Sequence, residues 1–203
     1  MENKNSTVMK LAQTAILAAL CFVTFTFLQI KIPMPGGDAT SLHIGNAFCV
    51  LASLLLGGVY GGLAGAIGMG IADILDPVYI LSAPKTIVLK FCIGLITGLF
   101  AHKIAHINES TDPKYVFKWS LISCIAGLGF NVIADPVVGY FYKIYILGQP
   151  QEMASILAKW SSFSTFVNAI VSTILVAVIY NVLRPALVKS GLLVISHRQH
   201  AHA

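Results

Sequence analysis

The chain has 203 residues, of which 57% are hydrophobic and only 10% are charged. Soluble domains carry roughly 25% charged residues, so this chain lacks the polar side chains that a water-facing surface needs. With a mean hydropathy of +0.82, the composition excludes a soluble or secreted domain and predicts an all-α membrane protein. At roughly 20 residues per helical span plus short loops, the length allows a compact bundle of about six transmembrane helices. We expect one domain over residues 1–203.

Six apolar segments separated by polar or glycine-rich breaks follow one another along the chain. The expected spans cover about residues 8–30, 44–57, 61–75, 85–102, 115–134 and 155–183. The first segment is too long for the apolar core of a cleavable signal peptide, so we expect none. Prolines and glycines in the polar loop 31–43 exclude a continuous helix there.

Two local breaks refine this arrangement. We expect residues 57–62, which are rich in glycine, to form a very tight turn. The fifth segment is expected to break near Asp135-Pro136 and to resume through Tyr145. Because the second and third segments are short, a five-helix arrangement in which that pair forms a re-entrant hairpin is the alternative.

Lysine and arginine residues divide unequally between the two ends of such a bundle. With six spans, both termini and the polar segment 103–114 share one side. That side holds Lys4, Lys10, Lys103, Lys114, Lys118, Arg184, Lys189 and Arg198, and the other side holds Lys31, Lys85, Lys143 and Lys159. The positive-inside rule therefore makes both termini cytoplasmic, with tails over 1–7 and about 190–203. The same distribution explains the net charge of +5 without nucleic acid.

Polar and aromatic residues gather towards the opposite, outer end. Ionisable residues inside a membrane are costly and are functional candidates by default. We therefore expect a ligand pocket lined by the 31–43 loop, the outer ends of spans three to five and the start of span six. The candidate substrate-binding residues are His43, Asn46, Asp73, Lys85, Lys90, Asn131, Asp135, Trp160 and Asn168.

Structural roles are the alternative for part of this set. Asp73 or Asp135 paired with Lys90 would form a structural ion pair, which also orients a neighbouring pocket. The buried amide of Asn168 suits hydrogen bonds to a heterocycle and serves equally well as a link between helices.

Small residues recur at a spacing of four. The glycine pairs are Gly58-x-x-x-Gly62, Gly61-x-x-x-Gly65 and Gly94-x-x-x-Gly98. Such pairs let helices approach closely, and we expect them to serve tight packing. Ala15-x-x-x-Ala19, with Ala18, forms a flat strip that either packs inside the bundle or docks to another membrane protein. The four cysteines lie in apolar runs without C-x-x-C spacing and are expected to be buried free thiols.

Motifs typical of enzymes do not occur in the sequence. His102 and His106, and His197, His200 and His202 in the tail, are expected to be solvated and not to bind metal. H-E-x-x-H, G-x-S-x-G and a phosphate-binding Gly-Lys-Ser/Thr are all missing. We expect neither an enzyme nor a cofactor nor a metal site.

A run of motifs continues through most of the chain. It comprises Ala15-x-x-x-Ala19, Ile32-Pro33-Met34-Pro35, Leu42-His43-Ile44-Gly45-Asn46-Ala47, the glycine-rich stretch 54–68, Ala72-Asp73-Ile74-Leu75, and Ala83-Pro84-Lys85-Thr86-Ile87-x-x-Lys90 with Gly94. In this order they resemble the substrate-binding S component of energy-coupling factor (ECF) vitamin transporters, over essentially the whole chain. Segment 44–98 is most similar to the branch named for riboflavin transport, which looks to include hydroxymethylpyrimidine and vitamin B6 carriers. That branch commonly has an acidic residue where this chain has Asn46.

The resemblance implies a division of labour among subunits. The chain would bind one vitamin-like molecule from outside, under the 31–43 loop, in a prokaryotic cell membrane. Two ATPase subunits and a transmembrane coupling subunit would supply the energy, and Ala15 and Ala19 would face the coupling subunit. The runner-up is a self-sufficient secondary transporter or channel, a class that often shows internal repeats, and we find no convincing repeat. A membrane enzyme or scaffold is a third class.

Overall fold

The structure is a computed structural model that describes residues 4–193, apart from the side chains of residues 4–6 and 35. Arg198 and the three histidines of the C-terminal tail, His197, His200 and His202, lie outside the described residues, as do the outermost parts of both predicted tails.

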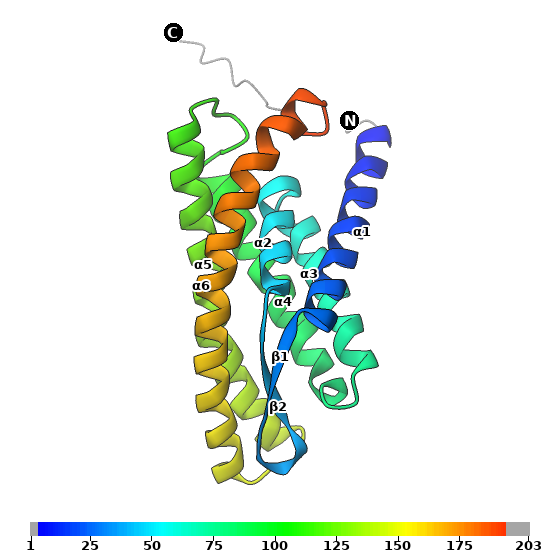
Figure 1. Cartoon of the computed structure of the whole chain (residues 1–203), viewed down its shortest axis with the longest axis vertical. Helices are drawn as coiled ribbons and strands as arrows, with labels where there is room; N and C mark the ends of the chain where they lie inside the picture. The colour runs from blue at the N-terminus through cyan, green and yellow to red at the C-terminus, as the bar shows by residue number, and fades with distance from the viewer. Residues whose placement is uncertain (1–3, 194–203) are drawn as a thin grey trace.

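Within the described residues, six α-helices and one β-hairpin follow each other. The helices are α1 (Lys4–Phe27), α2 (Gly45–Leu56), α3 (Gly58–Leu75), α4 (Ala83–Gly98), α5 (Pro113–Tyr145) and α6 (Gln151–Lys189), and the strands are β1 (Gln29–Pro33) and β2 (Ala39–His43). Successive helices alternate in direction, so the two described chain ends lie at one end of the bundle and the hairpin lies towards the other (Figure 1). The predicted helical bundle is confirmed, and the basic residues of the termini and of the α4–α5 connection share one end as predicted.

Five helical segments are long and apolar enough to cross a membrane, and α2 is the exception. The span that contains α4 runs over Ile80–Ile104 and includes the short helical segments on both sides of α4. Its 12 residues rise about 1.5 Å each and give about 18 Å, which is less than the roughly 30 Å of a bilayer core. Nearly all residues of α2 are buried, because the helix contacts α1, α3, α4 and α6. The length of α3, which is sufficient to span, argues against the re-entrant pair of the five-helix alternative.

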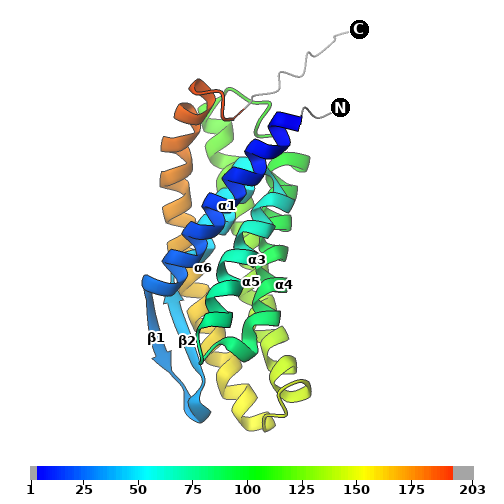
Figure 2. The same cartoon turned by 90° about the vertical axis from the view of Figure 1, so that its right-hand side faces the viewer.

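The predicted polar loop 31–43 is in large part an antiparallel hairpin. Gln29 pairs with His43 and Pro33 with Ala39, and β2 packs on α6. The tip turns at Gly36 and Gly37, whose φ values of +80° and +79° suit glycine. Figure 2 shows the hairpin extending beyond the end of α1.

Two predicted breaks are wrong. The turn expected over 57–62 shrinks to Gly57, whose φ of +96° is accessible to glycine, and α3 begins directly at Gly58. The break at Asp135-Pro136 does not occur, because α5 continues through Pro136 to Tyr145. A proline removes one backbone hydrogen bond from a helix, and here the long contact of α5 with α6 supports the helix on both sides of that position.

The glycine pairs do serve close packing, as predicted. A Cβ atom on Gly94 would overlap the backbone of Gly62, and one on Gly98 would overlap the backbone of Gly58. Helices α3 and α4 therefore touch along backbone surfaces that only glycine leaves open. All four cysteines are free thiols; three are buried and Cys92 is half-buried.

His102 was predicted to be solvated, but in the structure it contacts α2. Its Nε2 lies 2.9 Å from the carbonyl oxygen of Ser53, near the C-terminal end of α2. The same carbonyl oxygen also accepts a hydrogen bond from the backbone N–H of Gly57, so the His102 ring is its second partner at the end of α2. His106 is exposed, as expected.

Candidate functional site

A cavity of about 110 Å³ lies beneath the hairpin, at the end of the bundle away from the described chain ends. The hairpin, α1, α3, α4, α5 and α6 all contribute to its lining. Six candidates from the sequence meet there: His43, Asp73, Lys85, Lys90, Asp135 and Asn168.

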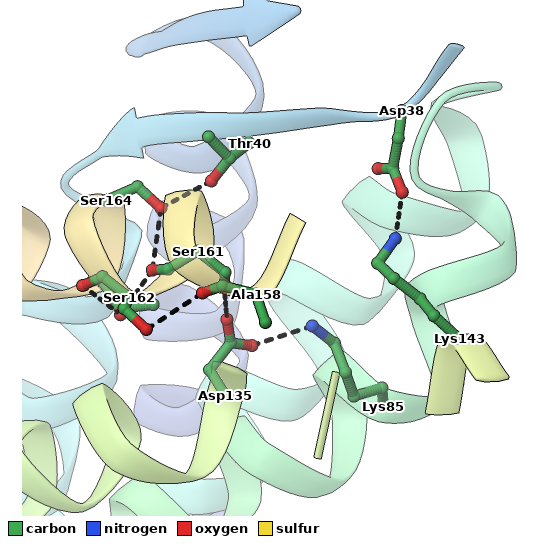
Figure 3. Close-up of polar contacts among 10 residues, drawn as sticks. Asp38, Thr40, Lys85, Asp135, Lys143, Ala158, Ser161, Ser162 and Ser164 are labelled. Atoms are coloured by element: carbon green, nitrogen blue, oxygen red, sulfur yellow. Dashed lines mark hydrogen bonds and ion pairs between the residues drawn. The ribbon is translucent and has the colours of Figure 1, made fainter. Parts of the chain in front are cut away.

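Asn168 fixes the hairpin above the cavity. Its side-chain oxygen accepts a hydrogen bond from the backbone N–H of His43 at 3.0 Å, and its amide nitrogen donates to the carbonyl of Ser41 at 2.9 Å. The hydroxyls of Thr40 and Ser164 lie 2.5 Å apart and form a further link between β2 and α6 (Figure 3). The amide of Asn168 is therefore engaged by the roof of the cavity.

His43 belongs to an aromatic wall. Its ring meets the Phe25 ring edge-on, with the two ring centroids 4.6 Å apart. The centroid of the Phe25 ring lies 6.3 Å from the centroid of the Tyr79 ring. His43 Nδ1 accepts a hydrogen bond from the backbone N–H of Gly45 at 3.2 Å. Burial lowers the pKa of His43 to about 3, so the imidazole is neutral at pH 7.

Two ion pairs cross the cavity from different elements. Lys85 on α4 lies 2.9 Å from Asp135 on α5, and the second oxygen of Asp135 accepts a hydrogen bond from the Ser161 hydroxyl. Lys143 on α5 pairs with Asp38 at the hairpin tip (Figure 3). The alternative pairing of Asp135 with Lys90 does not form, because Asp135 pairs with Lys85 instead.

Lys90 and Asp73 are left over from these pairs. Both side chains are buried, with 6% and 2% of their surface exposed. Among the described residues, the Lys90 ammonium has no hydrogen bond or ion pair. Within the same part of the chain, one carboxylate oxygen of Asp73 has no hydrogen-bond partner. Unpaired polar groups buried at this depth are costly unless something else satisfies them.

Three sequence candidates do not line this cavity. Asn46 and Asn131 are each 1% exposed and lie in the interior of the bundle. The amide oxygen of each has no hydrogen-bond partner in the described part of the chain. Trp160 is 44% exposed and packs edge-on against Phe163.

Several lining residues were missed by sequence reasoning. Ser161, Ser164 and Thr165 precede Asn168 on α6 and line the cavity with it. Their spacing of three, four and seven is the period of one helix face, and this signal was available in the sequence. Asp38 and Lys143 also line the cavity, but no local pattern marks them.

The alanine strip of α1 divides between two environments. Ala18 is buried and packs against Gly68 of α3, whereas Ala15 and Ala19 are exposed. The exposed pair lines a shallow apolar groove between α1 and α3, whose other wall includes Leu63, Ile67 and Ile71.

Comparison with known proteins assigns the chain to a family. The family described as ECF-type riboflavin transporter, S component, matches residues 5–185. An uncharacterised protein of Pyrococcus woesei is 34% identical over 79 residues, which are 39% of this chain and 51% of the relative, so the match spans about half of that relative. A UPF0397 protein of Streptococcus pneumoniae (strain Hungary19A-6) is 31% identical over 129 residues, which are 63% of this chain and 68% of the relative.

Solved structures share the fold. ThiT from Listeria monocytogenes superposes with a TM-score of 0.62 at 21% identity, over 89% of this chain and 97% of ThiT. The S component of a bacterial ECF transporter superposes with a TM-score of 0.59 at 20% identity, over 89% of this chain and 98% of the other. The chain is thus a multi-pass membrane protein that belongs to the family of ECF-type riboflavin transporter S components, a family of transport proteins and not of enzymes.

Proposed function

We propose that this chain is the high-affinity substrate-binding subunit of an ECF-type importer in the cell membrane. It captures a vitamin or vitamin precursor from outside and delivers it together with a transmembrane coupling subunit and two ATPase subunits. The observation that carries the proposal is the roofed polar cavity at one end of the bundle, in a chain of this family.

The packing of the bundle favours a dependent subunit over the runner-up, a self-sufficient transporter or channel. Leu54, Met69 and Ile93 are fully buried on α2, α3 and α4, and they fill the middle of the bundle. Packed apolar side chains therefore separate a ligand in the cavity from the end of the bundle where the described chain ends lie. Release on that side needs a rearrangement, and partners that consume ATP supply the energy for it.

The groove beside Ala15 and Ala19 supports a docking site for the coupling subunit. Small side chains let a partner helix approach closely, and the attraction is mostly short-range packing. Both residues point away from the bundle's own core, so they are free to meet a partner. Bulky side chains there would hold the partner apart.

Uptake by reconstituted vesicles tests both parts of the proposal. Vesicles that hold the chain with coupling and ATPase subunits should accumulate the ligand only with ATP, and vesicles with the chain alone should not. Accumulation by the chain alone would overturn the proposal in favour of the runner-up.

The variant Ala15→Trp/Ala19→Trp separates docking from binding. Uptake and co-purification with the coupling subunit should collapse, while ligand affinity of the purified chain stays within about twofold, since the cavity lies at the other end of the bundle. Ile133→Trp is the control, because Ile133 is 70% exposed on α5, far from the groove. Loss of binding in the double variant would instead show that the strip stabilises the bundle itself.

A further inference from the structure

We propose that the cavity takes a single-ring aromatic heterocycle that is not phosphorylated, with a hydrogen-bond donor facing Asp73 and an acceptor facing Lys90. This ligand class rests on the proposed function of the chain as a binding subunit. It differs from the large flavin that gives the family its name.

The charges around the cavity balance one another. Three lysines and three aspartates line the cavity, namely Lys85, Lys90, Lys143, Asp38, Asp73 and Asp135. Their formal charges cancel, and two of the three possible pairs are already made. A phosphate ester would add roughly two negative charges to this neutral site. Burying charge without compensation costs several kcal/mol, so the site favours a ligand with no net charge.

Lys90 and Asp73 remain available to contact a ligand. Lys90 is on α4 and Asp73 on α3, and the two do not form an ion pair with each other. Lys90 offers only donors, and the free oxygen of Asp73 offers only an acceptor. A molecule with an acceptor and a donor on its edge satisfies both at once. Ring nitrogens with neighbouring amino or hydroxyl groups have this pattern.

The size and shape of the cavity also suit a small ring. A cavity of about 110 Å³ is well above the roughly 10–15 Å³ that a single water needs and well below the roughly 300–1,000 Å³ of pockets for drug-sized ligands. This size favours one substituted ring over three fused rings with a polyol chain. Phe25, His43 and Tyr79 form an aromatic wall, and aromatic rings stack well on such surfaces.

Titration calorimetry of the purified full-length chain tests the ligand class. The probes are an amino-substituted hydroxymethylpyrimidine, pyridoxine, riboflavin and pyridoxal phosphate. At least one of the two unphosphorylated single-ring probes should bind at least about tenfold more tightly than riboflavin and pyridoxal phosphate. Riboflavin or pyridoxal phosphate binding as tightly, or neither single-ring probe binding, would overturn the proposal.

Variants test the two contacts. Lys90→Met and Asp73→Leu should each weaken the best single-ring probe by about 5- to 150-fold. Asp76→Leu is the matched control, since Asp76 pairs with Lys31 and does not line the cavity, and it should change affinity less than about threefold. Thermal unfolding identifies variants that fail to fold. Asp73→Asn or Lys90→Gln then replaces the variant that failed at the same position.

The outcomes separate the ligand class from the function. Tight binding of riboflavin with ATP-dependent uptake would overturn the ligand class and leave the binding-subunit function intact. Unchanged affinity in both cavity variants would overturn the assigned contacts. If no probe binds and vesicles with all partners take up none of them, both proposals fail.

Discussion

Asn168 illustrates how much a single buried side chain decides in this protein. The sequence left two roles open for it, contact with a heterocycle and a link between helices. In the structure both ends of its amide bind the backbone of β2, so it holds the roof of the cavity in place. His43, at the end of the same strand, is equally enclosed, and its neutral form follows from that enclosure.

The buried imidazole of His43 predicts a stability that depends on pH. Its pKa is lowered from 6.5 to about 3 in the fold. Between these values the unfolded chain binds a proton that the folded chain does not, so stability falls as the pH drops below 6.5. From pH 7 to pH 5 the loss from this group is about 2 kcal/mol.

Thermal unfolding in detergent at pH 7 and pH 5 measures this effect. The midpoint of the wild type should fall on acidification, and His43→Gln should lose markedly less over the same interval because glutamine does not titrate. An equal loss in the variant would assign the effect to other groups. Lys90 and Asp135 act on the His43 charge in opposite directions, so neither determines the sign.

Helices α3 and α4 show the same principle at the scale of elements. Their contact depends on the absence of side chains at Gly58, Gly62, Gly94 and Gly98. Because α3 carries Asp73 and α4 carries Lys85 and Lys90, this contact also sets the distance between charged groups of the site.

A methyl group at Gly94 should therefore separate the two helices. Overpacking costs about 1–3 kcal/mol, so Gly94→Ala should lower the thermal midpoint in detergent. Gly129→Ala is the matched control, since Gly129 is also helical and a Cβ there would meet nothing within 4 Å. Alanine is the better helix former by about 1 kcal/mol, so the control should be neutral or stabilised. A Gly94 variant as stable as the control would contradict the close approach.

The hairpin is the second element on which the site depends. Lys143 and Asp38 tie its tip to α5, and 13% and 16% of their side chains are exposed. Lys31 and Asp76 tie β1 to the end of α3, but 42% of the lysine side chain is exposed. Enclosed pairs are costly to break, whereas exposed pairs contribute about 0–1 kcal/mol.

Hydrogen exchange of the hairpin amides compares the contributions of these two ion pairs. Lys143→Met should reduce protection in β1 and β2 by about 5- to 150-fold, because it leaves Asp38 without its partner. Lys31→Met should reduce protection by less than about fivefold. Equal effects of the two variants would mean that the tip contact does not hold the hairpin closed.

At the scale of the whole molecule, the alternating direction of the helices and the distribution of lysines predict the orientation of the bundle across the membrane. The end with the described chain ends carries most of the basic residues (Figure 1), so the positive-inside rule predicts that this end faces the cytoplasm. The cavity then opens towards the outside, which is the orientation that capture of an external solute requires.

Cysteine labelling in intact cells tests this orientation. In a background without the native cysteines, Thr111→Cys and Gln151→Cys should react from opposite sides, with only Gln151→Cys labelled by an impermeant reagent from outside. Both positions are exposed loop or helix-end sites at opposite ends of the bundle. Labelling of both from outside would contradict the arrangement.

The sequence by itself determined the features that depend on composition and on order along the chain. Low charge content and six apolar segments predicted the helical membrane bundle, and the glycine pairs predicted a close helix contact that the structure confirms. It also predicted six residues that line the cavity, because polar and ionisable side chains within or beside apolar segments are costly and therefore easy to recognise in a sequence.

Only the tertiary structure decided which side chains face each other. The rotation of α6 about its axis turns Trp160 outwards and Asn168 inwards. The relative depth of the side chains pairs Asp135 with Lys85 and leaves Lys90 without an ion pair among the described residues. An isolated two-stranded hairpin is marginal in water, so the strands over 29–43 depend on their contact with α6. Pro136 stays helical for a similar reason, since packing outweighs local preference. These choices follow from contacts between distant segments, which no local pattern records.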